Sequence, residues 1–401
     1  MPDEPFPPTF RWGTTSSSTG GEGASPRADW FAWEAEGRAP RSSDGNGWAT
    51  NFVDDIALLR TLGTNAIRIT VEWARVEPAA GSIDGEVVDR YRRMLEAARQ
   101  AGLDPWITLH DGSLPGWFSD DAHGFRDEHA RGYYWPRHVD RCAEWFEDVV
   151  AGWVAIDDPT GWALRGHLWG SRPPGRRDPL VAREALIGAI DANHAAWKLL
   201  RGGTAATMCV VAVHEPHVDR ASDETTHPDV AAWAYLGALQ HGLLDLPTIG
   251  SIEMPHLVES YDYLGVSHIA AQQSVSGGPS GPSERGAGGP SGPSERGVRG
   301  EPARLTECVY RIAEARDPRP IVIAANGIAT DDEDARDEYL RGVVDQLRLL
   351  RIDGVAVIGY FHHTGIDGYE WNDGFARPRG LIDRARALKP AGEFFRDLKK
   401  S

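Results

Sequence analysis

The chain has 401 residues, of which 41% are hydrophobic and 25% are charged, and its formal net charge is −17 at pH 7. This composition is typical of a globular protein and excludes a disordered or fibrous chain. The excess of acidic residues argues against a nucleic acid or an anionic membrane surface as a partner.

The cysteines and the N-terminus indicate a compartment. Cys142, Cys209 and Cys308 lie far apart and match neither a metal-binding spacing nor a disulfide framework, so we expect a reducing, cytoplasmic environment. Residues 1–13 lack the basic and apolar segments of a signal peptide. No apolar stretch reaches the length of about 18 residues that a membrane-spanning helix needs, so we expect no membrane partner.

Short apolar runs alternate along the chain with longer amphipathic patterns. The runs predict eight strands, near residue 10 and at 64–70, 104–110, 152–157, 207–214, 261–268, 319–325 and 354–361. The intervening patterns predict helices, for example at 86–100, 180–200 and 334–351.

Near-continuous apolar strands separated by amphipathic helices are typical of parallel βα units. Eight such units predict a single (β/α)8 TIM barrel domain over residues 1–401, with long βα loops and with its chemistry at the carboxyl ends of the strands. A doubly wound open sheet is the alternative fold. The absence of a GxGxxG fingerprint or a P-loop after any strand disfavours it.

One segment departs from this rhythm. Residues 277–287 and 288–298 read GGPSGPSERGA and GGPSGPSERGV, a direct duplication of eleven residues. Segments rich in Gly, Pro and Ser do not form a packed core, so we expect a flexible loop over 271–300, inserted after the sixth strand. We interpret it as a neutral insertion, with a lid over the site as the alternative.

Several stretches, in chain order, resemble glycoside hydrolase family 1, the β-glucosidase-like retaining glycosidases. The most specific, residues 54–84, is similar to the second βα unit of that family. The others are FRWGTTSSSTGGEGA (10–24), TLHDGSLPGWF (108–118), WVAIDDP (153–159), PIVIAANGIA (320–329), DGYEWNDGF (367–375) and GLIDRA (380–385). The resemblance covers nearly the whole chain. It implies the barrel fold and a glycoside, or another polyhydroxylated small molecule, as the ligand.

The resemblance also implies two catalytic glutamates, but neither is present at its place. WVAIDDP stands where the family has W-x-T-x-N-E-P, which puts Asp158 at the general acid/base and Asp157 at the asparagine before it. PIVIAANGIA stands where the family has I-T-E-N-G, which puts Ala325 at the nucleophile. Because alanine cannot form the glycosyl-enzyme intermediate of a retaining mechanism, Ala325 opposes ordinary β-glycosidase activity.

The sugar-binding positions implied by the resemblance are partly replaced. The family's glutamine, histidine, tyrosine and tryptophan fall on Gly20, Asp111, Ile269 and His363. The substrate-binding candidates are Glu370, Trp371, Arg68 and Asn326, which are retained, together with His268 at the end of the sixth strand.

Three interpretations of this rewritten site compete. In the first, acid–base chemistry replaces the nucleophile, and the catalytic candidates are Asp158, Asp157, Asp111 and His363. Asp157 and Asp158 would repel each other, so that one pKa rises into the range of a proton donor, and a histidine would act as the base. Inverting hydrolysis, a lyase and an isomerase all remain open.

In the second interpretation the site holds a divalent metal such as Zn, Mn or Fe. The ligands would come from His110, Asp111, His214, His268 and His363. No local motif such as HExxH supports this set, so we expect no cofactor on this basis.

In the third interpretation the protein is a pseudoenzyme that binds a carbohydrate without catalysis. The gain of ionisable groups in place of neutral sugar binders favours a new function over a lost one.

Some of these side chains also have a structural interpretation. We expect Glu72 to pair with Arg68, and His110 to pack or to bond to the backbone. His362 is expected to point outward, because side chains alternate along a strand, which leaves His363 as the better candidate for the pocket.

Overall fold

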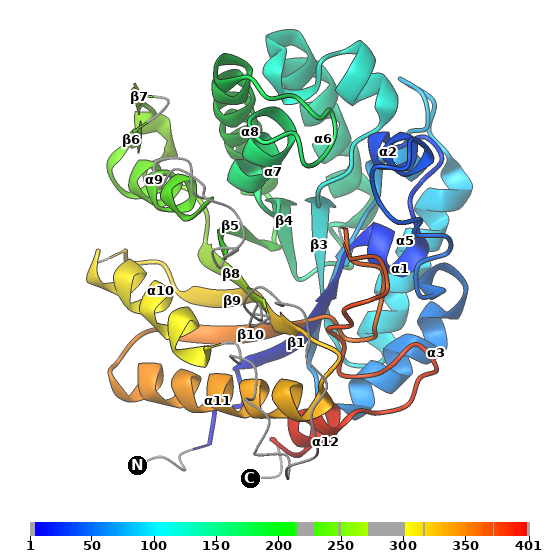
Figure 1. Ribbon diagram of the computed structural model, residues 1–401, viewed down its shortest axis with the longest axis vertical. Coiled ribbons are helices and arrows are strands. Elements are labelled where there is room, and N and C mark those ends of the chain that lie inside the picture. The colour runs from blue at the N-terminus through cyan, green and yellow to red at the C-terminus, as the bar shows by residue number, and fades with distance from the viewer. Residues whose placement is uncertain are drawn as a thin grey trace, which may run out of the picture.

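The computed structural model describes residues 5–214, 228–247, 250–271, 301–315, 317–371 and 373–398. Eight parallel strands close into a barrel in the order β1-β10-β9-β8-β5-β4-β3-β2, and helices surround them (Figure 1). The barrel strands are β1 (Arg11–Ser16), β2 (Ala66–Thr70), β3 (Asp104–His110), β4 (Gly152–Ile156), β5 (Ala206–His214), β8 (Tyr263–Ala271), β9 (Ile321–Ala329) and β10 (Val357–His363). This closed topology confirms the predicted (β/α)8 barrel and excludes the open sheet.

All eight predicted strands are present in the barrel. The seventh, β9, continues to Ala329, four residues beyond the predicted end. Its pairing with β8 persists through Asn326 and Gly327 although these residues interrupt the apolar run. A small antiparallel sheet of β6 (Leu243–Leu246) and β7 (Gly250–Glu253) lies outside the barrel.

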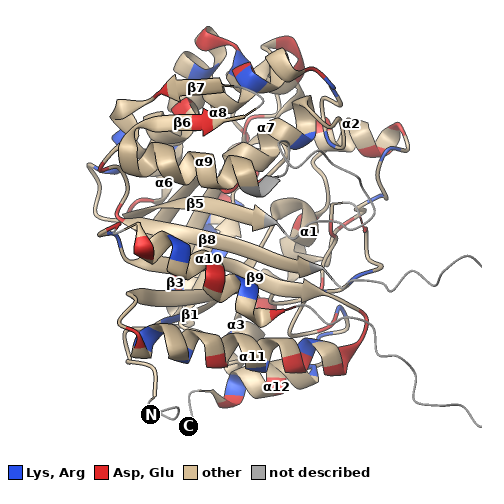
Figure 2. Cartoon of the chain, turned by 60° about the vertical axis from the view of Figure 1, so that its left-hand side comes forward, with Lys and Arg blue, Asp and Glu red and all other residues tan. Residues whose placement is uncertain are grey.

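The predicted helices at 86–100, 180–200 and 334–351 correspond to α5, α8 and α11. The described helices of the outer layer and the loops are α1 (Ser18–Glu22), α2 (Asp29–Ala35), α3 (Trp48–Thr61), α4 (Trp73–Val76), α5 (Gly85–Gln100), α6 (Trp135–Phe146), α7 (Pro159–His167), α8 (Pro179–Leu200), α9 (Pro228–His241), α10 (Pro302–Glu314), α11 (Glu333–Ile352) and α12 (Pro390–Asp397). Their outward faces carry charged side chains, as α10 and α11 show in Figure 2.

The longest helices begin at aspartates that cap them. Asp84, Asp178 and Asp332 stand just before α5, α8 and α11, and each carboxylate accepts hydrogen bonds from two backbone N–H groups of the first turn. Such a cap satisfies donors that the helix itself leaves unpaired. In α8 a proline follows at the first helical position, where its missing N–H costs nothing.

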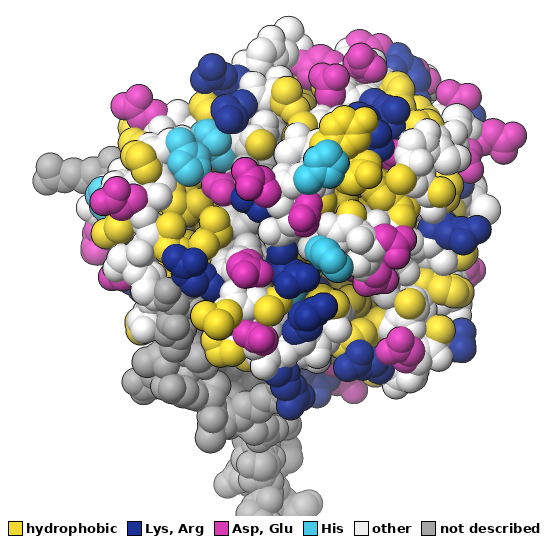
Figure 3. Space-filling model, turned by 90° about the horizontal axis from the view of Figure 1, so that it is seen from above, with side chains coloured by type: hydrophobic (Ala, Val, Ile, Leu, Met, Phe, Trp, Pro, Cys, Tyr) yellow, Lys and Arg dark blue, Asp and Glu magenta, His cyan; other side chains and the backbone are white. Residues whose placement is uncertain are grey.

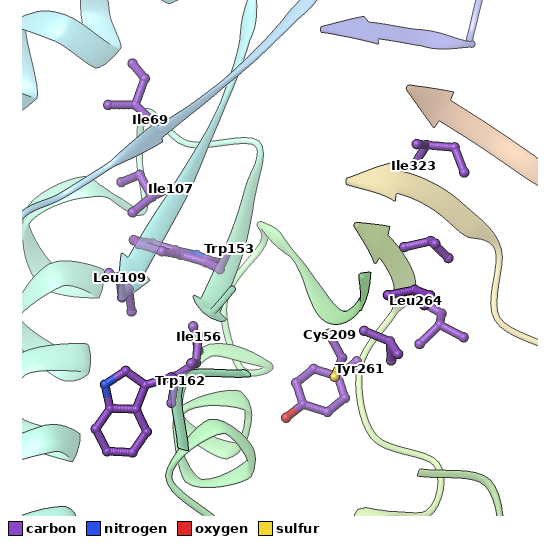
Figure 4. Packing of buried hydrophobic residues seen from close by; sticks show 14 of the residues in the cluster. Ile69, Ile107, Leu109, Trp153, Ile156, Trp162, Cys209, Tyr261, Leu264 and Ile323 are labelled. Carbon is purple, nitrogen blue, oxygen red and sulfur yellow. The ribbon is translucent and has the colours of Figure 1, made fainter. Parts of the chain in front are cut away.

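The barrel interior is filled by its own side chains. Its inner cluster consists of Ala66, Trp106, Val154, Met208, Val210, Val322, Ala324 and Phe361, each at most 1% exposed. The large rings fit because neighbouring strands carry glycines: a Cβ on Gly152 would lie 2.4 Å from the Trp106 ring, and one on Gly13 would lie 2.5 Å from Phe361. A second, larger cluster fills the space between strands and helices and includes Ile107, Trp153 and Leu264 (Figure 4).

The outer surface carries both signs of charge. On the face in Figure 3, acidic, basic and apolar side chains are interspersed. None of the helices in the described ranges is both long and apolar enough to cross a membrane. The duplicated segment at 277–298, and the predicted loop from residue 272 onward, lie outside the described residues.

Candidate functional site

The carboxyl ends of β2, β3 and β4 bring Arg68 and Asp157 together at one end of the barrel, because these strands are neighbours in the sheet. Arg68 is 3% exposed. Its guanidinium binds the carboxylate of Asp157, donates to Thr108 Oγ1 at 3.1 Å and donates to the carbonyl of Ala324 at 3.2 Å. One buried cation therefore links β2, β3 and β9 to the residue that follows β4.

Asp111 follows β3 and is the carboxyl group best suited to carry a proton here. Burial raises its pKa to about 8, the charge of Asp157 contributes to the rise, and Arg68 and Arg172 partly oppose it. We expected Asp157 and Asp158 to be the repelling pair. In the structure the charge of Asp157 acts on Asp111, and the carboxylate of Asp158 binds Arg165.

Asp158 is the N-cap of α7, and donors from that helix hold its carboxylate. It accepts a hydrogen bond from the Gly161 N–H at 2.8 Å and from Arg165 Nη2 at 2.6 Å, and Pro159 occupies the first turn. These partners are matched to an ionised carboxylate, whereas a general acid must offer a proton. The geometry therefore opposes the expected role of Asp158 as proton donor.

Glu370 forms a second charged centre with Arg379 and His363. It is 3% exposed, and its Oε2 lies 2.5 Å from Arg379 Nη1 and 3.6 Å from His363 Nε2. Burial disfavours the charged form, but Arg379, His363 and Arg172 outweigh it and lower the pKa of Glu370. Glu370 is thus an ionised group, and it brings His363 to the site as predicted.

Arg172 lies against Trp371, another predicted residue. Its guanidinium carbon is 5.0 Å from the ring centre of Trp371 and 6.0 Å from that of Trp30, and the two indoles meet edge to face at 4.7 Å. Gly112, with φ of 96°, leaves the space: a Cβ there would lie 3.2 Å from Trp371 and 3.3 Å from Arg172.

A narrow hollow with a volume of about 30 Å³ lies beside the ends of β1 and β2 and extends to Trp48 and Leu59 of α3. Hydroxyl groups and one guanidinium dominate the polar part of its lining, which includes Thr15, Ser16, Ser17, Ser18, Arg68 and Thr70. Such groups can exchange hydrogen bonds with a polyhydroxylated ligand.

Two predicted substrate-binding residues are instead packed inside the protein. The Asn326 amide donates to the His268 carbonyl at 2.8 Å and to Tyr339 Oη at 3.0 Å, and it accepts from Tyr360 Oη at 3.1 Å. Asn326 is 0% exposed and His268 is 1% exposed. The Asn326 side chain is thus held by protein groups, and His268 contributes its backbone carbonyl to that contact.

The histidines divide as the alternation along the strands predicts. His110 donates from Nδ1 to the Ser113 carbonyl at 3.1 Å, and burial lowers its pKa to about 4. His362 donates from Nε2 to the Arg379 carbonyl at 3.1 Å, and burial lowers its pKa to about 3. Both are therefore neutral groups that bond to the backbone.

The predicted metal set is not assembled among the described residues, where no group of three or more His, Cys, Asp or Glu side chains could hold an ion. His110 faces a carbonyl, His363 faces Glu370, and His268 is packed. The side chain of His214 lies outside the described residues.

Glu72 does not pair with Arg68, contrary to expectation. Its Oε2 accepts hydrogen bonds from the hydroxyl of Ser18 and from that of Ser113 at 2.9 Å. The guanidinium of Arg68 instead binds the carboxylate of Asp157.

Three arginines of the site escaped the sequence reasoning: Arg165, Arg172 and Arg379. They lie in α7 and in loops, where no periodic pattern marks a side chain that turns inward. The available signal was the basic residues of GSRPPGRR (170–177) and ARPRG (376–380), which stand beyond strand ends in a strongly acidic chain.

The sequence profile of Glycosyl hydrolase family 1 matches residues 3–401. Among curated proteins, β-glucosidase A of Thermotoga maritima is 24% identical over 453 aligned positions, covering 99% of this chain and 98% of that protein. Klotho of Mus musculus is 27% identical over 367 positions, covering 83% of this chain and 34% of that protein.

Solved structures agree with the sequence comparison. A β-glycosidase from Pyrococcus horikoshii superposes with a TM-score of 0.81 at 25% identity, covering 99% of this chain and 95% of that one. A β-glucosidase from Thermotoga maritima in complex with glucoimidazole superposes with a TM-score of 0.80 at 21% identity, covering 99% of both chains.

Proposed function

This chain belongs to glycosyl hydrolase family 1, and we propose that it binds a glycoside or sugar-like small molecule at the carboxyl end of its barrel without cleaving it by double displacement. The pairing of Arg68 with Asp157, beside Ala325 at the nucleophile position, carries the proposal. Double displacement needs a carboxylate free to attack the anomeric carbon. Ala325 provides none, and Asp157 is bound to the guanidinium.

The ligand class is supported by the polar groups at this end of the barrel. Hydroxyl groups of Thr15, Ser16 and Thr70 stand near the ends of β1 and β2, and Glu370 is an ionised acceptor that can bind sugar hydroxyls. The β-glucosidase of Thermotoga maritima, which shares this fold, has been solved with glucoimidazole and with castanospermine. We carry that class of ligand, though not the hydrolytic activity, over to this chain.

Calorimetric titration with glucoimidazole tests binding. We expect saturable binding by the wild type, and a loss of at least about tenfold in affinity, or about 1.4 kcal/mol, in Glu370→Gln. Glu393→Gln, at an exposed position of α12, is the matched control and should bind like the wild type. Equal binding by both variants would place the ligand elsewhere.

Release of 4-nitrophenolate from 4-nitrophenyl β-D-glucoside tests the absence of cleavage. We expect no release above the buffer rate. Turnover within about tenfold of the Thermotoga maritima β-glucosidase, a barrier difference of about 1.4 kcal/mol, would overturn this part of the proposal. Azide should be added in a parallel assay, because rescue by azide would mean that the nucleophile is the only missing part.

Asp111 favours a second candidate function, proton transfer to a bound sugar derivative. Its pKa of about 8 keeps the carboxyl protonated at neutral pH, as a general acid requires. Hydration of D-glucal tests it, because a proton adds to C2 and water adds to C1 without a protein nucleophile. In D₂O we expect deuterium at C2 of the 2-deoxyglucose formed by the wild type and no product with Asp111→Asn. Equal rates for the two proteins would remove Asp111 from the mechanism.

We also propose the cytoplasm as the working compartment. The three cysteines of the protein are buried free thiols, and free thiols are typical of proteins in a reducing environment. Export with retained folding in an oxidising compartment would count against this assignment.

A further inference from the structure

Four arginines meet at the carboxyl end of the barrel, and three of them are matched by a carboxylate. The matched pairs are Arg68–Asp157, Arg165–Asp158 and Arg379–Glu370. Arg172 is the exception, because no carboxylate of the described residues lies within 4.0 Å of its guanidinium. Arg379 has a second carboxylate partner in Asp373, so Arg172 differs from the other three in having no ion-pair partner among the described residues.

The position of Arg172 is fixed even though it has no ion pair. Its guanidinium lies over Trp371, which Trp30 supports from the side. Its Nε is buried and has no hydrogen-bond partner among the described residues. Gly112 has no Cβ, and this leaves the space that the guanidinium of Arg172 occupies. A guanidinium held in this way is preorganised, so little side-chain entropy is lost when it binds a ligand.

A neutral ligand would leave the guanidinium of Arg172 without a counter-ion. Burial lowers its pKa to about 9, Arg165 and Arg379 add to this effect, and Asp158 and Asp111 oppose it. A desolvated cation without a counter-ion is costly. An anion that enters with the ligand would remove that cost.

The geometry favours a carboxylate over a larger anion. A guanidinium presents parallel N–H groups that match the two oxygens of a carboxylate, and a carboxylate brings a single negative charge to the one guanidinium that lacks an ion pair. A phosphate monoester carries a charge of roughly −1.5 to −2 at neutral pH. Its additional negative charge would lie near Asp111 and Asp158.

We propose that Arg172 binds a carboxylate on the ligand, so that the ligand is a sugar acid or a glycoside of one. This inference rests on the proposed binding function, and it names the class of sugar that the same site takes.

Calorimetric titration with three probes tests the inference: methyl β-D-glucopyranoside, methyl β-D-glucopyranosiduronate and D-glucose 6-phosphate. We expect the wild type to bind the uronate at least about tenfold more tightly than the neutral glycoside, a difference of about 1.4 kcal/mol. Arg172→Gln should abolish that preference. Arg172→Lys should retain part of it, because lysine keeps the positive charge but lacks the two parallel N–H groups of a guanidinium. Arg93→Gln, at an exposed position of α5, is the matched control and should keep the full preference.

The outcomes separate the two proposals. Equal affinity of the wild type for the uronate and the neutral glycoside would overturn the role of Arg172 and leave the binding function intact. No binding of either would overturn both. Tighter binding of the phosphate than of the uronate would overturn the carboxylate assignment. The comparison of probes on the wild type is decisive even where Arg172→Gln fails to fold.

Discussion

The guanidinium of Arg68 binds the carboxylate of Asp157, 89 residues further along the chain. The two side chains are 3% and 17% exposed. Under the motif correspondence that we infer from the sequence, Ala325 stands at the nucleophilic glutamate of family 1 and Asp157 at an asparagine. The proposed site would then keep one carboxylate beside Arg68 and lack the one that attacks a glycosidic bond.

Replacing Asp157 by asparagine leaves Arg68 buried without a counter-ion. We expect Asp157→Asn to lower the free energy of unfolding by about 3 kcal/mol, since breaking a buried pair strands its charge. Urea denaturation measures this. Asp345→Asn is the control, because Asp345 is 67% exposed in its pair with Arg348 and such surface pairs contribute little. A loss no larger than that of the control would contradict the role given to Asp157.

The raised pKa of Asp111 makes stability depend on pH. Between the unfolded pKa of 3.8 and the folded pKa of about 8, the folded protein binds a proton that the unfolded chain does not. Stability therefore falls as pH rises through this window. From pH 5 to pH 9 we expect the wild type to lose more stability than Asp111→Asn, by about 4 kcal/mol, since each pH unit between 5 and 8 contributes about 1.4 kcal/mol.

Urea denaturation at several pH values measures this difference. Asp29, whose pKa burial also raises to about 8, contributes equally to both proteins and cancels in the comparison. Parallel pH profiles for the two proteins would show that Asp111 ionises in the ordinary acid range.

Restoring the nucleophile alone should not restore hydrolysis. In Ala325→Glu, Asp158 still binds Arg165 and Gly161, so no free carboxylate at its family position can activate the water that hydrolyses the glycosyl-enzyme. Misplaced catalytic groups cost about 100-fold or more, and we expect 4-nitrophenyl β-D-glucoside turnover to stay at least that far below a family 1 β-glucosidase. Robust hydrolysis by this single variant would mean that Asp158 can leave its cap and act as an acid.

Asp158 should behave in stability measurements as a helix cap. We expect Asp158→Ala to cost about 1 kcal/mol or more, as loss of an N-cap does. Asp178→Ala is the matched comparison, because Asp178 also precedes a proline and accepts from the first turn of its helix. Glucoimidazole affinity should be the same in both variants. A selective loss of binding in Asp158→Ala would return Asp158 to the pocket.

The sequence was sufficient for the barrel and for the helix starts. Eight apolar runs matched eight strands because a parallel strand is buried on both faces, and this gives it an uninterrupted apolar signature. The structural role of Asp158 was also readable: Asp158–Pro159 repeats the pattern of Asp178–Pro179, an N-cap followed by proline. Because the same residues resemble a catalytic motif, we interpreted Asp158 as a catalytic acid and not as an N-cap.

The pairings in the site could not be predicted in the same way. Arg68 finds Asp157 and Arg379 finds Glu370 through the closure of the barrel and the path of its loops, which no local pattern encodes. Asn326 stands at the end of an apolar run near the expected pocket, yet contacts with Tyr339 and Tyr360 hold it in the packed interior. Which side of a strand end a residue faces depends on irregularities such as the register shift between Val266 and Ser267.

The indole of Trp106, with the other seven side chains of the inner cluster, closes the barrel beneath the site. A molecule bound above this layer cannot pass through the filled interior of the barrel, so a saccharide chain cannot thread from one end of the barrel to the other. A bound ligand must also leave before the next one enters.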